Sequence, residues 1–305
     1  MATPFLKWAG GKRQIMSKLL SRFPIDINEY QYYVEPFLGG GSVLIEVLNK
    51  GFDGKIIAGD INPDIISCYR VIRDEIDQLI SELSNLTEEL PENLELRKPY
   101  YYSLRDEWNT GVGLRDDYSI TQEVRRAAVT ITLNKTCYNG LFRLNSKGEF
   151  NVPMGGTKKL NIYSESNLRK LNSLFQNVEF FTGDFSEISL NTTGNSKSFF
   201  YFDPPYRRLK KTSSLTMYNA DPFGDDEQIR LRDYINELVK SENHFVLSNS
   251  DPKNYSDDAF FDNVYQDYII DRVPARRSIN SKGTERGEIM ELIIRSNHPV
   301  VRNKE

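Results

Sequence analysis

The 305-residue sequence predicts an α/β fold with a largely parallel sheet and an inserted, mainly helical segment. Short apolar segments typical of strands alternate with amphipathic helical segments through most of the chain. One of them, 199–202, is aromatic at every position, which is expected of a strand covered on both faces. The interval 62–167 breaks the alternation, because it contains helical patterns and few strand candidates. We therefore expect one domain formed by 1–61 and 168–305, and a second at 62–167.

Strands are predicted where β-branched and aromatic residues lie between turn-forming residues. The six candidates are 33–35, 55–59, 178–182, 198–203, 244–248 and 289–295. A helix is predicted over 42–49, after a glycine run. Another is expected to begin at Asp225, which can cap it, because Leu231, Ile235 and Leu238 follow at helical spacing.

The composition excludes several classes of protein. With 39% hydrophobic and 27% charged residues, the chain is typical of a soluble globular protein. No apolar run is long enough to span a membrane and no signal peptide is recognisable, so we expect a cytoplasmic protein. Two cysteines, Cys68 and Cys137, and two histidines are too few for a disulfide framework and make a metal site improbable.

Charge is distributed very unevenly. The net charge of −4 argues against a nucleic-acid partner, and segment 74–95 has eight carboxylates and no lysine or arginine. In contrast, 135–159, 207–211 and 272–286 each carry a net charge of +4. If these three segments converge on one face, they suit a phosphate backbone. The alternative is that each is a solvated loop.

The clearest chemical motif follows the aromatic strand. Asp203-Pro204-Pro205-Tyr206 comes directly after it, and proline cannot donate to a sheet, so the chain must leave the sheet there. The strand end then presents a carboxylate, two free carbonyls and an aromatic ring. Four cations follow at once: Arg207, Arg208, Lys210 and Lys211.

A glycine run, Gly39-Gly40-Gly41, lies between a predicted strand and a predicted helix. Such glycines let the backbone approach a ligand at a helix N-terminus. Their spacing matches neither the dinucleotide fingerprint nor the phosphate-binding P-loop. Asp60 stands about twenty positions on, where an acidic residue binds ribose hydroxyls. A nucleoside cofactor without a pyrophosphate, such as S-adenosylmethionine, fits this arrangement.

The N-terminal segment PFLKWAGGKRQI has a second pair of glycines, Gly10-Gly11, before an amphipathic pattern. It predicts another strand-to-helix turn, with Trp8 and Lys12 one helical turn apart. The alternative for Trp8 is a core position, and for Lys12 a solvated one.

The segments FLKWAGGKRQ, EPFLGGG, GDIN, TGDF, YFDPPY and LSNSD occur in this order. Together they make the chain similar to the DNA adenine methyltransferase (Dam) family of the α arrangement. Its members transfer methyl from S-adenosylmethionine to adenine N6. The resemblance covers nearly the whole chain. It implies a Rossmann-like methyltransferase sheet with helices on both faces, a catalytic domain at 1–61 and 168–305, and a DNA target-recognition domain at 62–167.

The resemblance also implies roles for individual residues. Asp203 and the Pro204 carbonyl would accept both N6–H bonds of an adenine rotated out of double-stranded DNA, with Pro205 in the same loop and Tyr206 stacked on the base. The implied cofactor residues are Trp8, Lys12, Asp60, Asp184, Phe185 and Asp203. No metal and no covalent intermediate are implied.

Segment 137–153 is predicted to form a β-hairpin around Ser146-Lys147-Gly148 and is similar to the recognition hairpin of the family. The implied DNA contacts are Tyr138, Asn139, Arg143 and Pro153, with Arg207, Arg208, Lys210 and Lys211 in a loop over the DNA. Arg143 would read a guanine edge, or alternatively bind phosphate. The target expected from this hairpin is GATC or another site containing GAT. Gly156 stands where many members have arginine, which leaves the target sequence open.

Two other classes of protein are alternatives. Methyltransferases acting on RNA or on a protein amide use a similar pocket, but they usually carry asparagine in place of Asp203. A non-catalytic nucleic-acid-binding module would keep the basic hairpin and lose the intact motif at 203–206. A further open point is whether the enzyme works beside a cognate restriction endonuclease or in regulation.

Overall fold

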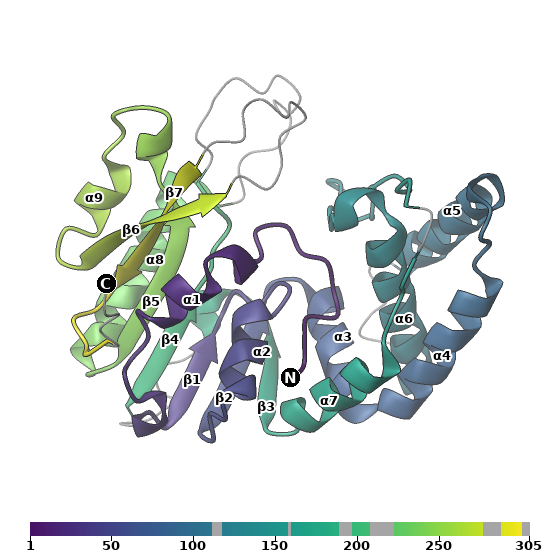
Figure 1. Ribbon diagram of the computed structural model, residues 1–305, viewed down its shortest axis with the longest axis horizontal. Coiled ribbons are helices and arrows are strands. Elements are labelled where there is room, and N and C mark those ends of the chain that lie inside the picture. Colours follow the sequence, from purple (N-terminus) through teal and green to yellow (C-terminus); the bar gives the residue numbers. More distant parts are fainter. Residues whose placement is uncertain (112–117, 158–159, 189–196, 208–222, 277–287, 301–305) are drawn as a thin grey trace. The chain divides into compact units, whose positions relative to one another are not determined.

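The structure is a computed structural model that describes residues 1–111, 118–157, 160–188, 197–207, 223–276 and 288–300. The chain divides into two compact units (Figure 1). The first consists of Met1–Gly11, Gly39–Gly51 and Asp60–Gly183, and the second of Lys12–Leu38, Phe52–Gly59 and Asp184–Glu305. The predicted recognition segment 62–167 falls inside the first unit. The functional division into catalytic and recognition domains stays a prediction.

Within the described residues, seven strands form one mixed sheet in the order β3-β2-β1-β4-β5-β7-β6. They are β1 (Tyr32–Glu35), β2 (Lys55–Asp60), β3 (Val178–Thr182), β4 (Ser198–Phe202), β5 (His244–Ser250), β6 (Ile269–Arg276) and β7 (Glu288–Arg295). Neighbouring strands β2, β1, β4 and β5 run parallel, whereas β7 is antiparallel to both β5 and β6. The prediction of an α/β fold with a Rossmann-like sheet is confirmed.

The centre of this sheet explains the aromatic run in the sequence. All five residues of β4 are buried. It pairs with parallel strands on both sides, which accounts for the absence of hydrophobic–polar alternation. In the second unit, helix α8 (Asp225–Lys240) packs against β5. Its buried positions include Leu231, Ile235 and Leu238, as the sequence predicts.

Three features differ from the sequence predictions. The edge strand β6 was not predicted, because its interior contains Pro274 among charged residues, a composition tolerated only where one side of a strand lacks a partner. The strand expected before Gly10-Gly11 is wrong, because residues 1–8 form no strand. Trp8 lies outside any helix, so the expected one-turn spacing from Lys12 is wrong as well. Lys12 begins a short 3₁₀ turn instead.

The first unit is mainly helical, as predicted for 62–167. Its helices are α2 (Ser42–Asn49), α3 (Pro63–Asp74), α4 (Ile76–Glu89), α5 (Leu94–Thr110), α6 (Ile120–Thr136) and α7 (Glu165–Phe175), with η4 (Tyr138–Gly140) after α6. The second unit also contains η1 (Lys12–Gln14), α1 (Met16–Leu20), η2 (Ile27–Glu29), η5 (Phe185–Glu187), η7 (Pro252–Asn254) and α9 (Phe260–Val264). Helix α6 packs against α3, α4 and α5, and 11 of its 17 residues are buried, so it is the core helix of the first unit.

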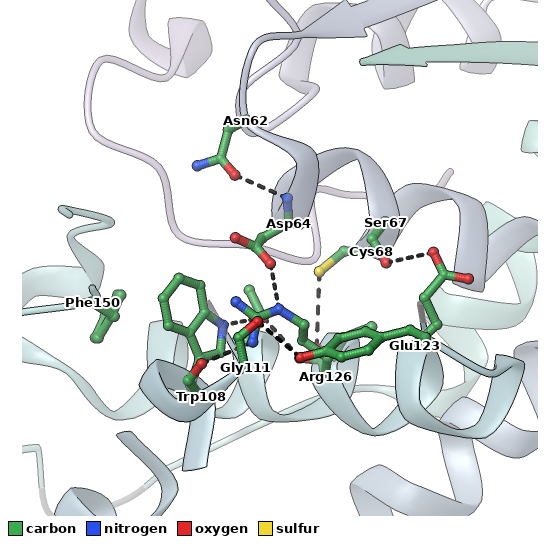
Figure 2. Close-up of polar contacts among 12 residues, drawn as sticks. Asn62, Asp64, Ser67, Cys68, Trp108, Gly111, Glu123, Arg126 and Phe150 are labelled. Carbon is green, nitrogen blue, oxygen red and sulfur yellow. Dashed lines mark hydrogen bonds and ion pairs between the residues drawn. The ribbon is translucent and has the colours of Figure 1, made fainter. Parts of the chain in front are cut away.

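A buried ion pair joins α3 to α6 (Figure 2). Arg126 Nε lies 2.6 Å from Asp64 Oδ1, and the two side chains are 7% and 1% exposed. The same guanidinium donates to the Trp108 carbonyl at 2.8 Å and lies 4.2 Å from the centroid of that indole ring. Asp64 itself is placed by Asn62, whose side chain caps α3 and accepts from the Asp64 amide at 3.0 Å. These contacts connect three helices around a single guanidinium.

Asp64→Ala should lower the free energy of unfolding by about 3–5 kcal/mol, because it leaves the Arg126 guanidinium buried without its counter-charge. Denaturant unfolding of the wild type and the variant measures this difference. Asp77→Ala is a suitable control, because the ion pair of Asp77 with Arg169 is largely exposed and its removal should leave the unfolding midpoint nearly unchanged. Equal midpoint shifts for the two variants would contradict this account of the helical core.

Candidate active site

The carboxylate of Asp203 lies just beyond the end of β4 and is held by two side chains of the second unit. Lys12 Nζ lies 2.6 Å from it, and the lysine side chain is 3% exposed while that of Asp203 is 24% exposed. The Ser248 hydroxyl, from β5, donates to Asp203 Oδ1 at 3.2 Å. Burial raises the pKa of Asp203 above its usual value, and the neighbouring Lys12 opposes that shift. The carboxylate is thus fixed in direction and still partly accessible.

The rest of the 203–206 loop is also held from outside. The Pro205 carbonyl accepts from Gln228 Nε2 at 3.1 Å, and the Tyr206 hydroxyl donates to Glu291 Oε2 at 3.0 Å. Gln228 is fully buried. Among the described residues, the Pro204 carbonyl accepts no hydrogen bond. The loop therefore presents one carboxylate and one carbonyl acceptor beside an anchored aromatic ring.

Arg207, which the resemblance places over DNA, is paired inside the protein. Its guanidinium forms ion pairs of 2.5 Å with Asp225 and with Asp258, and it lies 4.3 Å from the centroid of the Phe260 ring. The hydrogen bonds from Arg207 are the leading cause of a lowered pKa of Asp258. The other predicted cations of this loop, Arg208, Lys210 and Lys211, lie outside the described residues.

The third basic segment is represented by Arg272. This side chain pairs with Asp251 and Asp262, at 2.8 Å each. Residues 277–287 of the same segment lie outside the described part of the chain. For Arg207 and Arg272, the net positive charge counted along the sequence overstates the charge left for a ligand, because carboxylates from other segments neutralise it.

The glycine run in the first unit packs closely against two aromatic side chains. A Cβ added at Gly39 would come within 2.5 Å of Trp8 Nε1, and one added at Gly41 would clash with the Tyr69 hydroxyl. Gly39 and Gly41 also have φ values of +45° and +63°, which favour glycine. Trp8 therefore packs against the glycine loop. Both the backbone conformation and the close packing exclude residues with a side chain at Gly39 and Gly41.

Asp60 closes the same region at the end of β2. Its Oδ2 accepts from the Gly39 amide and its Oδ1 from the Asn62 amide, both at 2.9 Å. Burial raises the pKa of Asp60, while these two backbone hydrogen bonds favour the ionised form. A carboxylate accepts about four hydrogen bonds, so about two positions remain for the hydroxyls of a ribose. The residues present thus fit a nucleoside cofactor.

Asp184 and Phe185, expected to contact the adenine of the cofactor, are both engaged by Arg230 of α8. Two guanidinium nitrogens donate to the two carboxylate oxygens at 2.8 Å each, and the guanidinium lies 4.1 Å from the Phe185 ring centroid. These hydrogen bonds hold the pKa of Asp184 well below its usual range. Phe185 itself is 2% exposed and packs beside Phe37.

The predicted hairpin exists, with little regular pairing. Its turn is closed by an Asn145 amide hydrogen bond to the Glu149 carbonyl, and isolated bridges join Leu144 to Phe150 and Cys137 to Met154. Four residues assigned to DNA recognition are exposed on this segment: Tyr138, Asn139, Arg143 and Pro153. Three of them are fixed locally.

Local hydrogen bonds and one backbone conformation orient the exposed side of the hairpin. The Tyr138 amide donates to the Pro153 carbonyl at 2.9 Å, and Arg143 Nε donates to Asn151 Oδ1 at 2.7 Å. Asn139 adopts a left-handed conformation with φ of 55°. The Arg143 guanidinium is thus bound to the hairpin through Nε and, at 3.5 Å, through Nη2 to the Asn151 carbonyl, while the side chain stays exposed.

Sequence reasoning missed the residues that support the loop at 203–206. Ser248 and Asn249 lie within the quoted motif LSNSD, but no role was assigned to them. Gln228 lies in a segment without a recognised motif, and Glu291 lies in the last predicted strand, where no role was expected for it. The available signal was a polar residue on an otherwise apolar helix face or strand. Such a residue indicates a buried hydrogen bond, but it does not identify the residue that it binds.

The described residues contain neither a membrane-spanning helix nor a cluster of metal-ligating side chains. No helix among them is long and apolar enough to cross a membrane. No group of three or more potential metal-ligating side chains occurs in that part of the chain.

Comparisons with known proteins identify the family. Residues 8–279 match the model of the D12 class N6 adenine-specific DNA methyltransferases. The chain is 45% identical to the type II methyltransferase M.MjaIII of Methanocaldococcus jannaschii, over 95% of this chain and 98% of that protein. It is 33% identical to the type II methyltransferase M1.LlaDCHI of Lactococcus lactis subsp. cremoris, over 95% and 94%.

A third relative is the DNA adenine methylase of Haemophilus influenzae, at 32% identity over 95% of this chain and 92% of that protein. The family match and all three alignments extend through both units, so the resemblance to DNA adenine methyltransferases is confirmed. The chain belongs to the D12 class of N6 adenine-specific DNA methyltransferases.

Proposed function

We propose that this enzyme uses S-adenosylmethionine to methylate N6 of an adenine rotated out of double-stranded DNA. The observation that carries the proposal is the loop at 203–206. Its Asp203 carboxylate is held by Lys12 and Ser248, and its Pro204 carbonyl accepts no hydrogen bond from the described residues. Adjacent acceptors of this kind suit an exocyclic amino group, which has two hydrogens to donate.

The two acceptors address the low nucleophilicity of adenine N6, whose lone pair is delocalised into the ring. Hydrogen bonds from N6 to Asp203 and to the Pro204 carbonyl draw the nitrogen toward tetrahedral geometry. They also stabilise the positive charge that develops on it. S-adenosylmethionine supplies an electrophilic methyl group, and its sulfur keeps the electrons of the broken C–S bond. N6 would form the new bond with its lone pair and release one proton, and in this proposal the Asp203 carboxylate accepts that proton.

The ring of Tyr206 supplies the stacking surface in this proposal. An adenine outside the duplex has lost its stacking neighbours, at a cost of a few kcal/mol. An aromatic ring recovers about 1–3 kcal/mol of that cost. Pro205 restricts the backbone just before Tyr206, because its φ is fixed, and so reduces the number of positions that the ring can adopt.

The cofactor-binding groups are proposed from two places in the chain. Asp60 would bind the ribose hydroxyls, beside the glycine loop on which Trp8 packs. Asp184 and Phe185 would contact the adenine, and Lys12 would orient Asp203 near the methionine end. Because Arg230 binds both carboxylate oxygens of Asp184 and Phe185 is 2% exposed, the cofactor would have to share the Asp184 carboxylate with Arg230.

We also propose that the hairpin at 137–153 selects the target, with GATC as the leading sequence and other GAT-containing sites as alternatives. Two relatives are named type II methyltransferases and a third is named DNA adenine methylase. We propose work beside a cognate restriction endonuclease as one role for the enzyme, and regulation as the alternative.

Mapping of methylated adenines tests both the proposed reaction and the proposed target sequence. DNA from cells that express the wild type should carry N6-methyladenine at one short sequence containing GAT, whereas DNA from cells expressing Asp203→Ala should not. Methylation confined to another sequence would reject the target and keep the chemistry. Absence of N6-methyladenine, with purified enzyme inactive on the same DNA, would reject the proposed reaction.

A further inference from the structure

Glu291 is a carboxylate of β7 that contacts the proposed active-site loop. Its Oε2 accepts from the Tyr206 hydroxyl at 3.0 Å. In the sheet it is paired with Ser250 at the end of β5 and with Val273 of β6. Burial raises the pKa of Glu291, while Lys12 and the Tyr206 hydrogen bond oppose that shift. The carboxylate thus has a fixed backbone position and a defined side-chain partner.

The ring of Tyr206 is restrained at two places. Glu291 binds its hydroxyl, and the Lys12 ammonium lies 4.8 Å from its ring centroid. Lys12 also forms the ion pair with Asp203. The hydrogen bond to Glu291 limits where the Tyr206 hydroxyl can point, and the ammonium group of Lys12 limits rotation of the ring. A stacking surface that is already oriented loses less entropy when a base arrives.

The backbone on either side of this ring is held separately. Gln228 donates to the Pro205 carbonyl at 3.1 Å, and the Arg207 amide donates to Asn249 Oδ1 at 3.4 Å. Gln228 and Asn249 are fully buried and are joined by a 3.3 Å hydrogen bond. Removal of the Glu291 carboxylate should therefore change the orientation of the Tyr206 ring without releasing the loop backbone.

We propose that Glu291 is a positioning residue that orients the ring of Tyr206 for stacking on the adenine to be methylated. The inference rests on the proposed function, because it gives Tyr206 its stacking role. It adds a group outside the 203–206 motif to the machinery of the reaction. Glu291 acts on the substrate only through Tyr206, so its contribution should disappear when the tyrosine hydroxyl is absent.

A double-mutant cycle on the full-length protein tests this dependence. The variants are Glu291→Ala, Tyr206→Phe and the double variant, assayed by single-turnover methyl transfer to a duplex carrying the mapped site. A hydrogen bond to a charged group predicts a loss of rate of about 10-fold for each single variant. The double variant should be no slower than the slower single variant, because both changes remove the same hydrogen bond.

Three further measurements separate positioning from folding. Glu291→Gln keeps an oxygen acceptor and should restore most of the rate lost in Glu291→Ala. The dissociation constant for DNA should stay close to that of the wild type in all variants. Met290→Ala is the matched control, because the Met290 side chain is exposed and neighbouring side chains of a strand point to opposite faces. Its rate should equal that of the wild type.

Several results would overturn the proposal. One is a fully active Tyr206→Phe variant, which decides the point even if Glu291→Ala does not fold. Another is a double variant whose loss of rate is the product of the two single losses, because Glu291 would then act independently of the hydroxyl. In either case a wild type that methylates adenine keeps the proposed function intact. A wild type without methyltransferase activity removes both.

Discussion

Replacement of Asp203 with alanine should lower the rate of methyl transfer by about 10²- to 10³-fold or more, while DNA binding survives. Removal of one preorganised group that stabilises transition-state charge costs about this much in other enzymes. Asp203 is proposed to accept an N6–H bond while Lys12 and Ser248 hold it in place. Single-turnover transfer of a labelled methyl group at saturating DNA measures the chemical step, and fluorescence anisotropy measures binding.

The ion pair with Lys12 dictates the controls for this experiment. Asp203→Ala leaves a buried ammonium group without its partner, and such a loss costs about 3–5 kcal/mol of stability. Asp203→Asn keeps the size of the side chain and one acceptor oxygen, and should be folded and slow. Lys12→Met together with Asp203→Ala removes both charges and should be inactive and better folded than Asp203→Ala alone. Near wild-type turnover by any of these folded variants would remove Asp203 from the proposed mechanism.

The second large effect is expected on sequence discrimination. Arg143→Ala should reduce discrimination at one guanine position of the target by about 1–3 kcal/mol, the contribution of a bidentate arginine–guanine contact. The side chain is exposed, and Asn151 accepts from its Nε at 2.7 Å and from its Nη2 at 3.5 Å, so contact with a guanine edge requires Nη2 to leave that longer contact. The measurement is kcat/KM on duplexes that differ from the mapped target at a single base pair.

Two neighbouring substitutions make this result interpretable. Lys147→Ala removes an exposed cation from the same turn, and should weaken all duplexes to a similar degree, as expected of a phosphate contact. Asn151→Ala should lower discrimination at the same guanine less than Arg143→Ala does, because it removes the Nε contact and keeps the guanidinium. If Arg143→Ala lowers kcat/KM uniformly on every duplex, Arg143 binds phosphate and the hairpin does not read that base.

Local patterns in the sequence predicted six of the seven strands that the structure describes, together with helices α2 and α8. The run at 199–202 predicted a buried strand because each of its side chains is apolar or aromatic, and β4 is buried throughout. Strand β6 was missed because it depends on its partner β7 and tolerates Pro274 at a sheet edge. Propensity describes a strand well when the residues themselves require burial, and poorly when pairing alone stabilises it.

The sequence by itself determined the family, because several short motifs occur in a fixed order along the chain, and the same motifs predict the reacting groups. Only the tertiary structure decided which side chains act on those groups. Glu291 lies 85 positions from Tyr206, and Lys12 lies 191 positions from Asp203. Arg207, counted as a free cation along the chain, is neutralised by Asp225 and Asp258. Hydrogen bonds and ion pairs form between residues that folding brings within about 3 Å, and separation along the chain carries no record of that distance.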